Sequence, residues 1–119
     1  MRSGSMEFML ILSEDPELVA TEDQRQLAVQ QVGEYAMGLV GDGILKGGAP
    51  LHPVEEAKKV RTRNARQRVL DGPFAESKEV IAGYFVIEAA DMAGAVAIAA
   101  RCPNAVFGSV EVREIVPMG

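Results

Sequence analysis

The sequence contains very few of the residues that build metal and redox sites: its 119 residues include one cysteine, one histidine and no tryptophan. The lone Cys102 cannot form an internal disulfide bond, which agrees with the reducing cytoplasm that we expect for this protein. One histidine and one cysteine leave no pair of ligands at helical or hairpin spacing, so we predict no metal site and no cofactor. A carboxylate-only site for Mg²⁺ or Ca²⁺ stays open, although its usual loop pattern is missing.

Long apolar runs and an excess of positive charge are also missing. The most apolar stretch, around residues 89–100, is broken by Asp91 and Gly94 and falls short of the ~18 residues of a membrane span. A formal charge of −5 gives the chain no overall attraction to nucleic acid or to an anionic membrane. With 48% apolar and 24% charged residues, the composition is that of one soluble globular domain. We expect residues 1–5 to be a cloning scar and residues 6–119 to form that domain.

Hydrophobic periodicity predicts two helices and several short strands. The sequence Thr21-Glu22-Asp23-Gln24 fits a capping box, and apolar residues then recur every three or four positions as far as Leu39. Asp91 is a suitable cap for a second, alanine-rich helix that Pro103 cannot continue. The helices are expected over residues 21–40 and 92–101, and the strands over 7–12, 44–51, 58–63, 67–70, 80–87 and 109–115.

This order of elements favours the α+β class. Two strand–helix–strand units that flank a hairpin predict a ferredoxin-like split βαβ fold, with an inserted β-hairpin and both helices on one face of an antiparallel sheet. The strands at 7–12 and 80–87 are apolar on both sides, so the second face of the sheet also needs a cover. We expect that cover to be a second copy of the chain, packed sheet against sheet as a homodimer.

The segment Asp71-Gly72-Pro73-Phe74-Ala75-Glu76 lies between the hairpin and the strand at 80–87. Together with Lys78-Glu79 and the sequence of residues 83–87, it closely resembles the DGPF or YCII-related family. Residues 8–11 and 108–113 resemble the two ends of that family, so the resemblance extends over roughly residues 6–116. It implies a ferredoxin-like homodimer that forms a dimeric α/β barrel.

The resemblance implies little about chemistry. Some relatives are proposed to be enzymes because a histidine on their first helix meets an aspartate in a cleft between sheet and helix. Residues 21–40 contain no histidine here, so that pair does not carry over to this chain. Other relatives resemble partners encoded beside extracytoplasmic-function sigma factors, which indicates a regulatory setting.

The loop at residues 71–76 is the predicted site. Asp71 and Glu76 are candidate general acids or bases at the mouth of a sheet–helix pocket, and His52 is the only imidazole that could join them. The structural alternative is a rigid connector in which Gly72 and Pro73 shape the turn.

Three aromatic residues are candidate ligand-binding residues of the same cleft. They are Tyr35, Phe74 and Tyr84. Each also fits a role in the core: Phe74 could plug it, and the two tyrosines lie where the core pattern requires a large ring.

The hairpin holds half of all basic residues within eleven positions. Lys59, Arg61 and Arg63 alternate and therefore share one face. Nucleic-acid binding is disfavoured because no aromatic residues are interleaved for base stacking. The alternatives are a solvated hairpin whose charges prevent aggregation, an acidic protein partner, or the first-turn carboxylates of a second subunit.

Two hypotheses about function follow. The first is a homodimer that binds a small molecule near Asp71, Glu76 and His52, with cofactor-free proton transfer of the isomerase or lyase type as its enzymatic form. The second is a non-catalytic regulatory or interaction module that acts as a homodimer.

Overall fold

A four-stranded antiparallel sheet forms the centre of the protein in a computed structural model that describes residues 5–72 and 78–118. Its strands are β1 (Met6–Glu14), β2 (Leu45–Pro50), β5 (Val80–Ala89) and β6 (Gly108–Glu114), in the order β2-β5-β1-β6. Helix α1 connects β1 to β2 and helix α2 connects β5 to β6, and each connection passes over one intervening strand. This is the predicted ferredoxin-like split βαβ topology.

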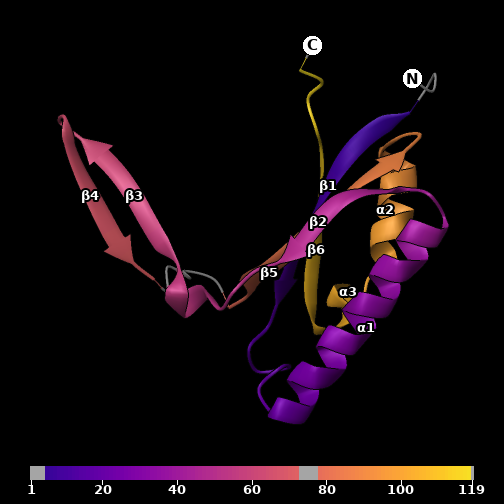
Figure 1. Cartoon of the computed structure of the whole chain (residues 1–119), viewed down its shortest axis with the longest axis horizontal. Helices are drawn as coiled ribbons and strands as arrows, with labels where there is room; N and C mark the ends of the chain where they lie inside the picture. The colour runs from indigo at the N-terminus through magenta and orange to yellow at the C-terminus, as the bar shows by residue number, and fades with distance from the viewer. Residues whose placement is uncertain (1–4, 73–77, 119) are drawn as a thin grey trace.

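Three helices lie on one side of this sheet (Figure 1). They are α1 (Glu22–Gly41), α2 (Met92–Ala100) and the short α3 (Asn104–Phe107). The predicted capping box is present at Thr21, and Asp91 caps α2 by accepting from the backbone N–H of Gly94 at 2.8 Å. None of the described helices is long and apolar enough to span a membrane.

The core lies between the helices and one face of the sheet. Alternate residues of β1 and β5 point toward the helices, and these side chains are buried: Phe8, Leu10, Leu12, Phe85 and Ile87. Leu39 of α1 and Ala95 and Ala99 of α2 complete the buried cluster. Full burial of each large apolar side chain contributes about 1.5–3 kcal/mol, so this layer is the main source of stability.

The other face of the sheet is apolar at its centre. Met9 and Ile11 of β1 lie opposite Val86 and Tyr84 of β5, and all four alternate with core residues. They remain partly exposed, and none of the three helices covers them (Figure 1). We call this surface the open face. Its composition agrees with the two-sided apolar strands expected from the sequence.

The junction between α2 and β6 fixes the chain to the end of β1. The amide of the buried Asn104 donates to the backbone carbonyl of Ser13 at 3.1 Å, and the backbone N–H of Asp15 donates to the carbonyl of Phe107 at 2.8 Å. A Cβ atom at Gly108 would lie 2.1 Å from the Ser13 carbonyl oxygen, so a side chain there would force β6 away from β1.

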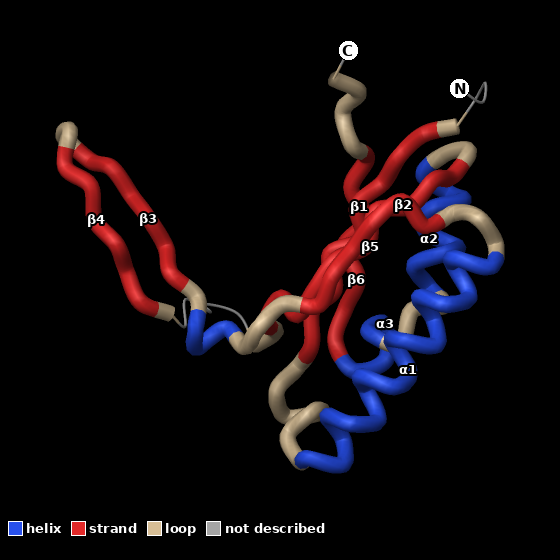
Figure 2. The backbone as a smooth tube through the Cα atoms, viewed as in Figure 1, coloured by secondary structure: helices blue, strands red, loops and turns tan. Residues whose placement is uncertain are grey.

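The inserted hairpin forms a separate two-stranded sheet from β3 (Lys58–Arg63) and β4 (Arg66–Asp71). It follows the 3₁₀ turn Val54–Glu56 and projects from the side of the sheet that the helices leave open (Figure 2). We call residues 58–71 the arm, and residues 5–57 and 78–118 the body. The radius of gyration is 16.2 Å, whereas a compact chain of this length would have about 13.5 Å. The difference reflects the projecting arm.

The turn of the arm is tighter than the sequence predicted. Asn64 and Ala65 alone form it, with φ of 52° and 62°, and Arg66 already belongs to β4. Positive φ at both central residues is the geometry of a two-residue hairpin turn that matches the twist of the strands.

Candidate functional site

His52 lies in the exposed loop that follows β2. Its side chain is 89% exposed, and Nδ1 lies 3.6 Å from Oε1 of Glu56 in the 3₁₀ turn. The imidazole therefore sits at the surface beside a carboxylate of its own loop, outside any enclosed pocket.

Asp71 ends β4 at the base of the arm. Its carboxylate lies 2.5 Å from Nζ of Lys58 on the neighbouring strand, and the side chain is 78% exposed. His52 and Asp71 thus lie beside different partners, His52 beside Glu56 and Asp71 in an ion pair with Lys58. Glu76 and Phe74, the remaining predicted residues of the loop, lie outside the described residues.

Lys78 contacts the β1–α1 loop. Its Nζ lies 3.2 Å from Glu17 and 3.3 Å from Asp15. Hydrogen bonds that the Lys78 ammonium donates, first to Glu17 and second to Asp15, raise the pKa of Lys78 above its ordinary value. This contact fixes the start of β5 beside the end of β1.

The two tyrosines lie on opposite faces of the sheet, so the expectation that they share one cleft is wrong. The Tyr35 hydroxyl donates to the backbone carbonyl of Ile98 at 2.7 Å, and its ring packs on Phe85 with centroids 5.8 Å apart. Burial raises the pKa of Tyr35 to about 12, so the phenol stays protonated at neutral pH. Tyr84 comes directly before Phe85 on β5, so its side chain points to the opposite, open face of the sheet.

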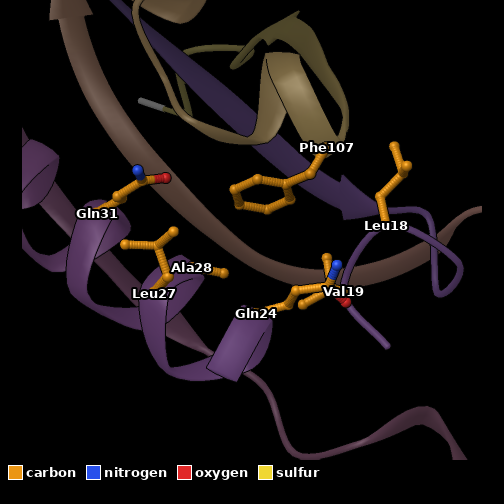
Figure 3. Close-up of a pocket in the computed structure, with 7 residues that line it drawn as sticks. All are labelled: Leu18, Val19, Gln24, Leu27, Ala28, Gln31 and Phe107. Carbon is orange, nitrogen blue, oxygen red and sulfur yellow. The ribbon is translucent and has the colours of Figure 1, made fainter. Parts of the chain in front are cut away.

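A small apolar pocket lies between α1, α3 and the β1–α1 loop. Figure 3 shows the ring of Phe107 facing α1, with the other lining residues around it: Leu18, Val19, Gln24, Leu27, Ala28 and Gln31. Its volume is about 90 Å³, whereas sites for drug-sized ligands have roughly 300–1,000 Å³. No titratable side chain among the described residues lines it, and the side-chain carbonyl of Gln24 already accepts from the backbone N–H groups of Ala20 and Thr21. The pocket has room for a small apolar group.

The open face combines an apolar centre with charges of both signs at its rim. Arg113 and Glu111 of β6 lie opposite Met9 and Ile11 of β1. At another part of the rim, Nζ of Lys46 lies 3.1 Å from the Glu88 carboxylate. A rim with both signs can pair with a copy of itself across a two-fold axis. Among residues 5–72 and 78–118, no group of three or more His, Cys, Asp or Glu side chains could hold a metal ion.

The arm carries the second distinctive surface. Its register places Arg61 opposite Arg68 and Arg63 opposite Arg66, all exposed. Neighbours across a ladder share a face, as do residues two apart on one strand, so these four side chains form one arginine face. The sequence predicted the alternation on β3. It missed the pairing of these arginines with those of β4, because that register depends on a two-residue turn.

These features can now be set beside known proteins. The profile of the YCII-related domain matches residues 6–119. The chain belongs to the YCII-related family. No curated protein matches it. Within this YCII-related chain the match includes the sheet, the helices and the arm, so the arm lies inside the family domain.

Proposed function

We propose that this protein is a homodimeric interaction module whose open sheet faces pack against each other. The observation that supports this is the exposed apolar centre formed by Met9, Ile11, Tyr84 and Val86. Apolar side chains at the middle of a sheet do not gain the free energy of burial as long as that face stays in water. Two copies related by a two-fold axis bring the same patch together from both sides and produce a barrel-like pair of sheets.

The proposed interface has the anatomy of a specific contact. An aromatic residue, Tyr84, lies in its centre, and charged residues such as Lys46 and Arg113 lie at its rim. Central aromatic residues often contribute 2 kcal/mol or more to association, whereas rim charges contribute little. Tyr84 is therefore the residue on which the dimer depends most.

Analytical ultracentrifugation of Tyr84→Lys tests the proposal. The wild type is expected to sediment as a dimer of the 12.7 kDa chain at micromolar concentration. The variant is expected to be a folded monomer, because Tyr84 does not pack in the helix-covered core. Val29→Lys is the matched control: Val29 is 75% exposed on α1, on the helix side of the sheet. A monomeric wild type, or a Tyr84→Lys protein that remains dimeric, would contradict the proposal.

A second candidate function is the binding of a small molecule beside α1. The pocket at Phe107 supports it, although acid–base chemistry at Asp71, His52 and Glu76 stays a prediction from the sequence alone. A thermal-shift screen of metabolites against the wild type, Leu27→Phe and Asp71→Asn separates the two sites. A stabilising compound that loses its effect only in Leu27→Phe binds the pocket, and one that loses it only in Asp71→Asn binds the predicted loop site. A screen with no stabilising compound would count against this function.

A further inference from the structure

The arm projects into solvent on the same side of the sheet as the open face (Figure 1). All residues of β3 are exposed, and in β4 only Leu70 is partly buried. An isolated two-stranded hairpin is marginally stable at best in water. A hairpin of this length that stands away from the body therefore calls for a contact beyond those seen within the described residues of one chain.

The arginine face shows what kind of contact is missing. Like charges placed directly opposite each other destabilise a β-ladder, and this arm contains two such pairs in succession, Arg61–Arg68 and Arg63–Arg66. By contrast, the opposite face of the arm has matched pairs, Val60 with Val69 and Lys58 with Asp71. An anionic surface laid against the arginine face would turn its repulsion into attraction.

The body of the same protein is strongly anionic. Residues 58–68 contain six of the twelve basic residues and no acidic residue. The body, residues 5–57 and 78–118, contains five basic against fifteen acidic residues, a formal charge of −10. A second copy seated on the open face brings this net negative charge to the side of the sheet from which the arm projects.

We infer that the arginine face of each arm docks on carboxylates of a second copy of this chain. The inference rests on the proposed dimer: a copy seated on the open face lies on the same side as the arm, and two-fold symmetry gives each copy one arm to donate and one to receive. The arms then clasp the dimer from outside while the open faces meet in its centre.

The dimer dissociation constant of Arg61→Gln/Arg68→Gln, measured by sedimentation equilibrium at 50 and 500 mM NaCl, tests this contact. The wild type is expected to bind more weakly at high salt, because exposed charge pairs are screened. The arm variant is expected to bind at least about tenfold more weakly at 50 mM NaCl and to lose most of the salt dependence. Arg25→Gln/Arg101→Gln removes the same charge from α1 and the end of α2, and is expected to stay within about twofold of the wild type.

The outcomes distinguish the arm contact from the dimer itself. If the wild type dimerises through Tyr84 and the arm variant dimerises equally well, the arm inference is wrong and the proposed function stands. If Arg61→Gln/Arg68→Gln and the control Arg25→Gln/Arg101→Gln weaken the dimer equally, the effect comes from the change in net charge. The arm inference is then also wrong. A monomeric wild type overturns both proposals.

A crosslinking experiment identifies the partner carboxylates. Arg61→Lys/Arg68→Lys keeps the charge and adds amines that a carbodiimide can join to a carboxylate in direct contact. In a mixture of ¹⁴N- and ¹⁵N-labelled protein, peptides of mixed isotope composition are expected to link the arm to the body. Crosslinks that join residues of one chain only would overturn the inference.

Nucleic acid is the competing anionic partner, because a two-stranded ribbon fits the major groove of DNA. Fluorescence anisotropy with a labelled duplex of about 20 base pairs at 50 mM NaCl is expected to show no binding at micromolar protein. Binding that requires Arg61 and Arg68, together with a dimer unaffected by their loss, would overturn the inference.

Discussion

The body and the arm of this protein are held together in different ways. In the body, side chains such as Phe8 and Ile87 are completely buried between a sheet and its helices. In the arm, Val60 and Val69 are 59% and 61% exposed and lie opposite each other across the ladder. The body thus carries its own stability within one chain, whereas the arm has backbone pairing without a core. The difference indicates that a single chain completes one region of this fold and leaves the other to a partner.

The largest expected effect is the difference in stability loss between a large-to-small substitution in the core and removal of the arm. Phe8→Ala is expected to lower the free energy of unfolding of the body by about 3–5 kcal/mol, because it leaves a cavity at a fully buried position. Replacing residues 58–71 with a short turn is expected to leave the thermal midpoint of a monomeric Tyr84→Lys background nearly unchanged.

The arm can be excised because its two ends already meet: the backbone N–H of Gly72 donates to the carbonyl of Ala57 at 2.7 Å. Thermal unfolding followed by circular dichroism measures both changes. An arm deletion that destabilises the monomer as much as Phe8→Ala would show that the two regions share one cooperative unit.

A smaller effect is expected at the junction of β6 with β1. Gly108→Ala places a methyl group 2.1 Å from the Ser13 carbonyl oxygen and 2.6 Å from Cα of Glu14, both of which are backbone atoms. We expect a loss of about 1–3 kcal/mol, the range for overpacking that shifts backbone. Gly33→Ala, at a helical glycine with open space around its Cβ position, is the matched control and is expected to be neutral or stabilising. Urea denaturation of both variants measures the difference.

The pH dependence of the body depends on Tyr35. Its folded-state pKa of about 12 lies above the ordinary value of 10, so the fold favours the neutral phenol. This contribution to stability is fully present below pH 10 and is lost as the pH rises from 10 through about 12.

Tyr35→Phe removes the hydrogen bond to the Ile98 carbonyl and is expected to cost about 1 kcal/mol at pH 7. The variant is also expected to lose less stability than the wild type between pH 10 and 12. Chemical denaturation at pH 7, 10 and 11.5 gives both values, and equal losses for the two proteins would show that Tyr35 is not the titrating group.

The smallest expected effect lies in the turn of the arm. Ala65 has φ of 62°, a left-handed conformation that carries a penalty of about 1–2 kcal/mol for residues other than glycine. Ala65→Gly is therefore expected to stabilise the arm by about 1 kcal/mol and to leave the body unchanged. Hydrogen exchange of the arm amides, compared with those of β1, measures the local gain. Slower exchange in β1 as well would mean that the arm and the body are coupled.

The sequence predicted the body well because its signals are local. The capping box at Thr21, the cap at Asp91 and the two-sided apolar pattern of β1 and β5 each gave an element that the structure contains. The short helix α3 was missed, because four residues after Pro103 give no helical periodicity.

The candidate site was harder to predict because it depends on strand register and on the sheet face to which each side chain points. The assignment of Tyr35 and Tyr84 to one cleft failed since residue types alone do not say that β5 turns Phe85 toward Tyr35 and Tyr84 away from it. The arginine face needed the match of β3 with β4, which a turn of two residues sets and a turn of three residues would have shifted.

Hydrogen exchange of the arm amides in the wild type and in the Tyr84→Lys monomer tests the central claim most directly. If a second copy completes the arm, the β3 and β4 amides are expected to exchange slowly in the dimer and close to the unprotected rate in the monomer, while the β1 and β5 amides stay protected in both. Equal protection of the arm in monomer and dimer would contradict the account, because the hairpin would then be stable without a partner.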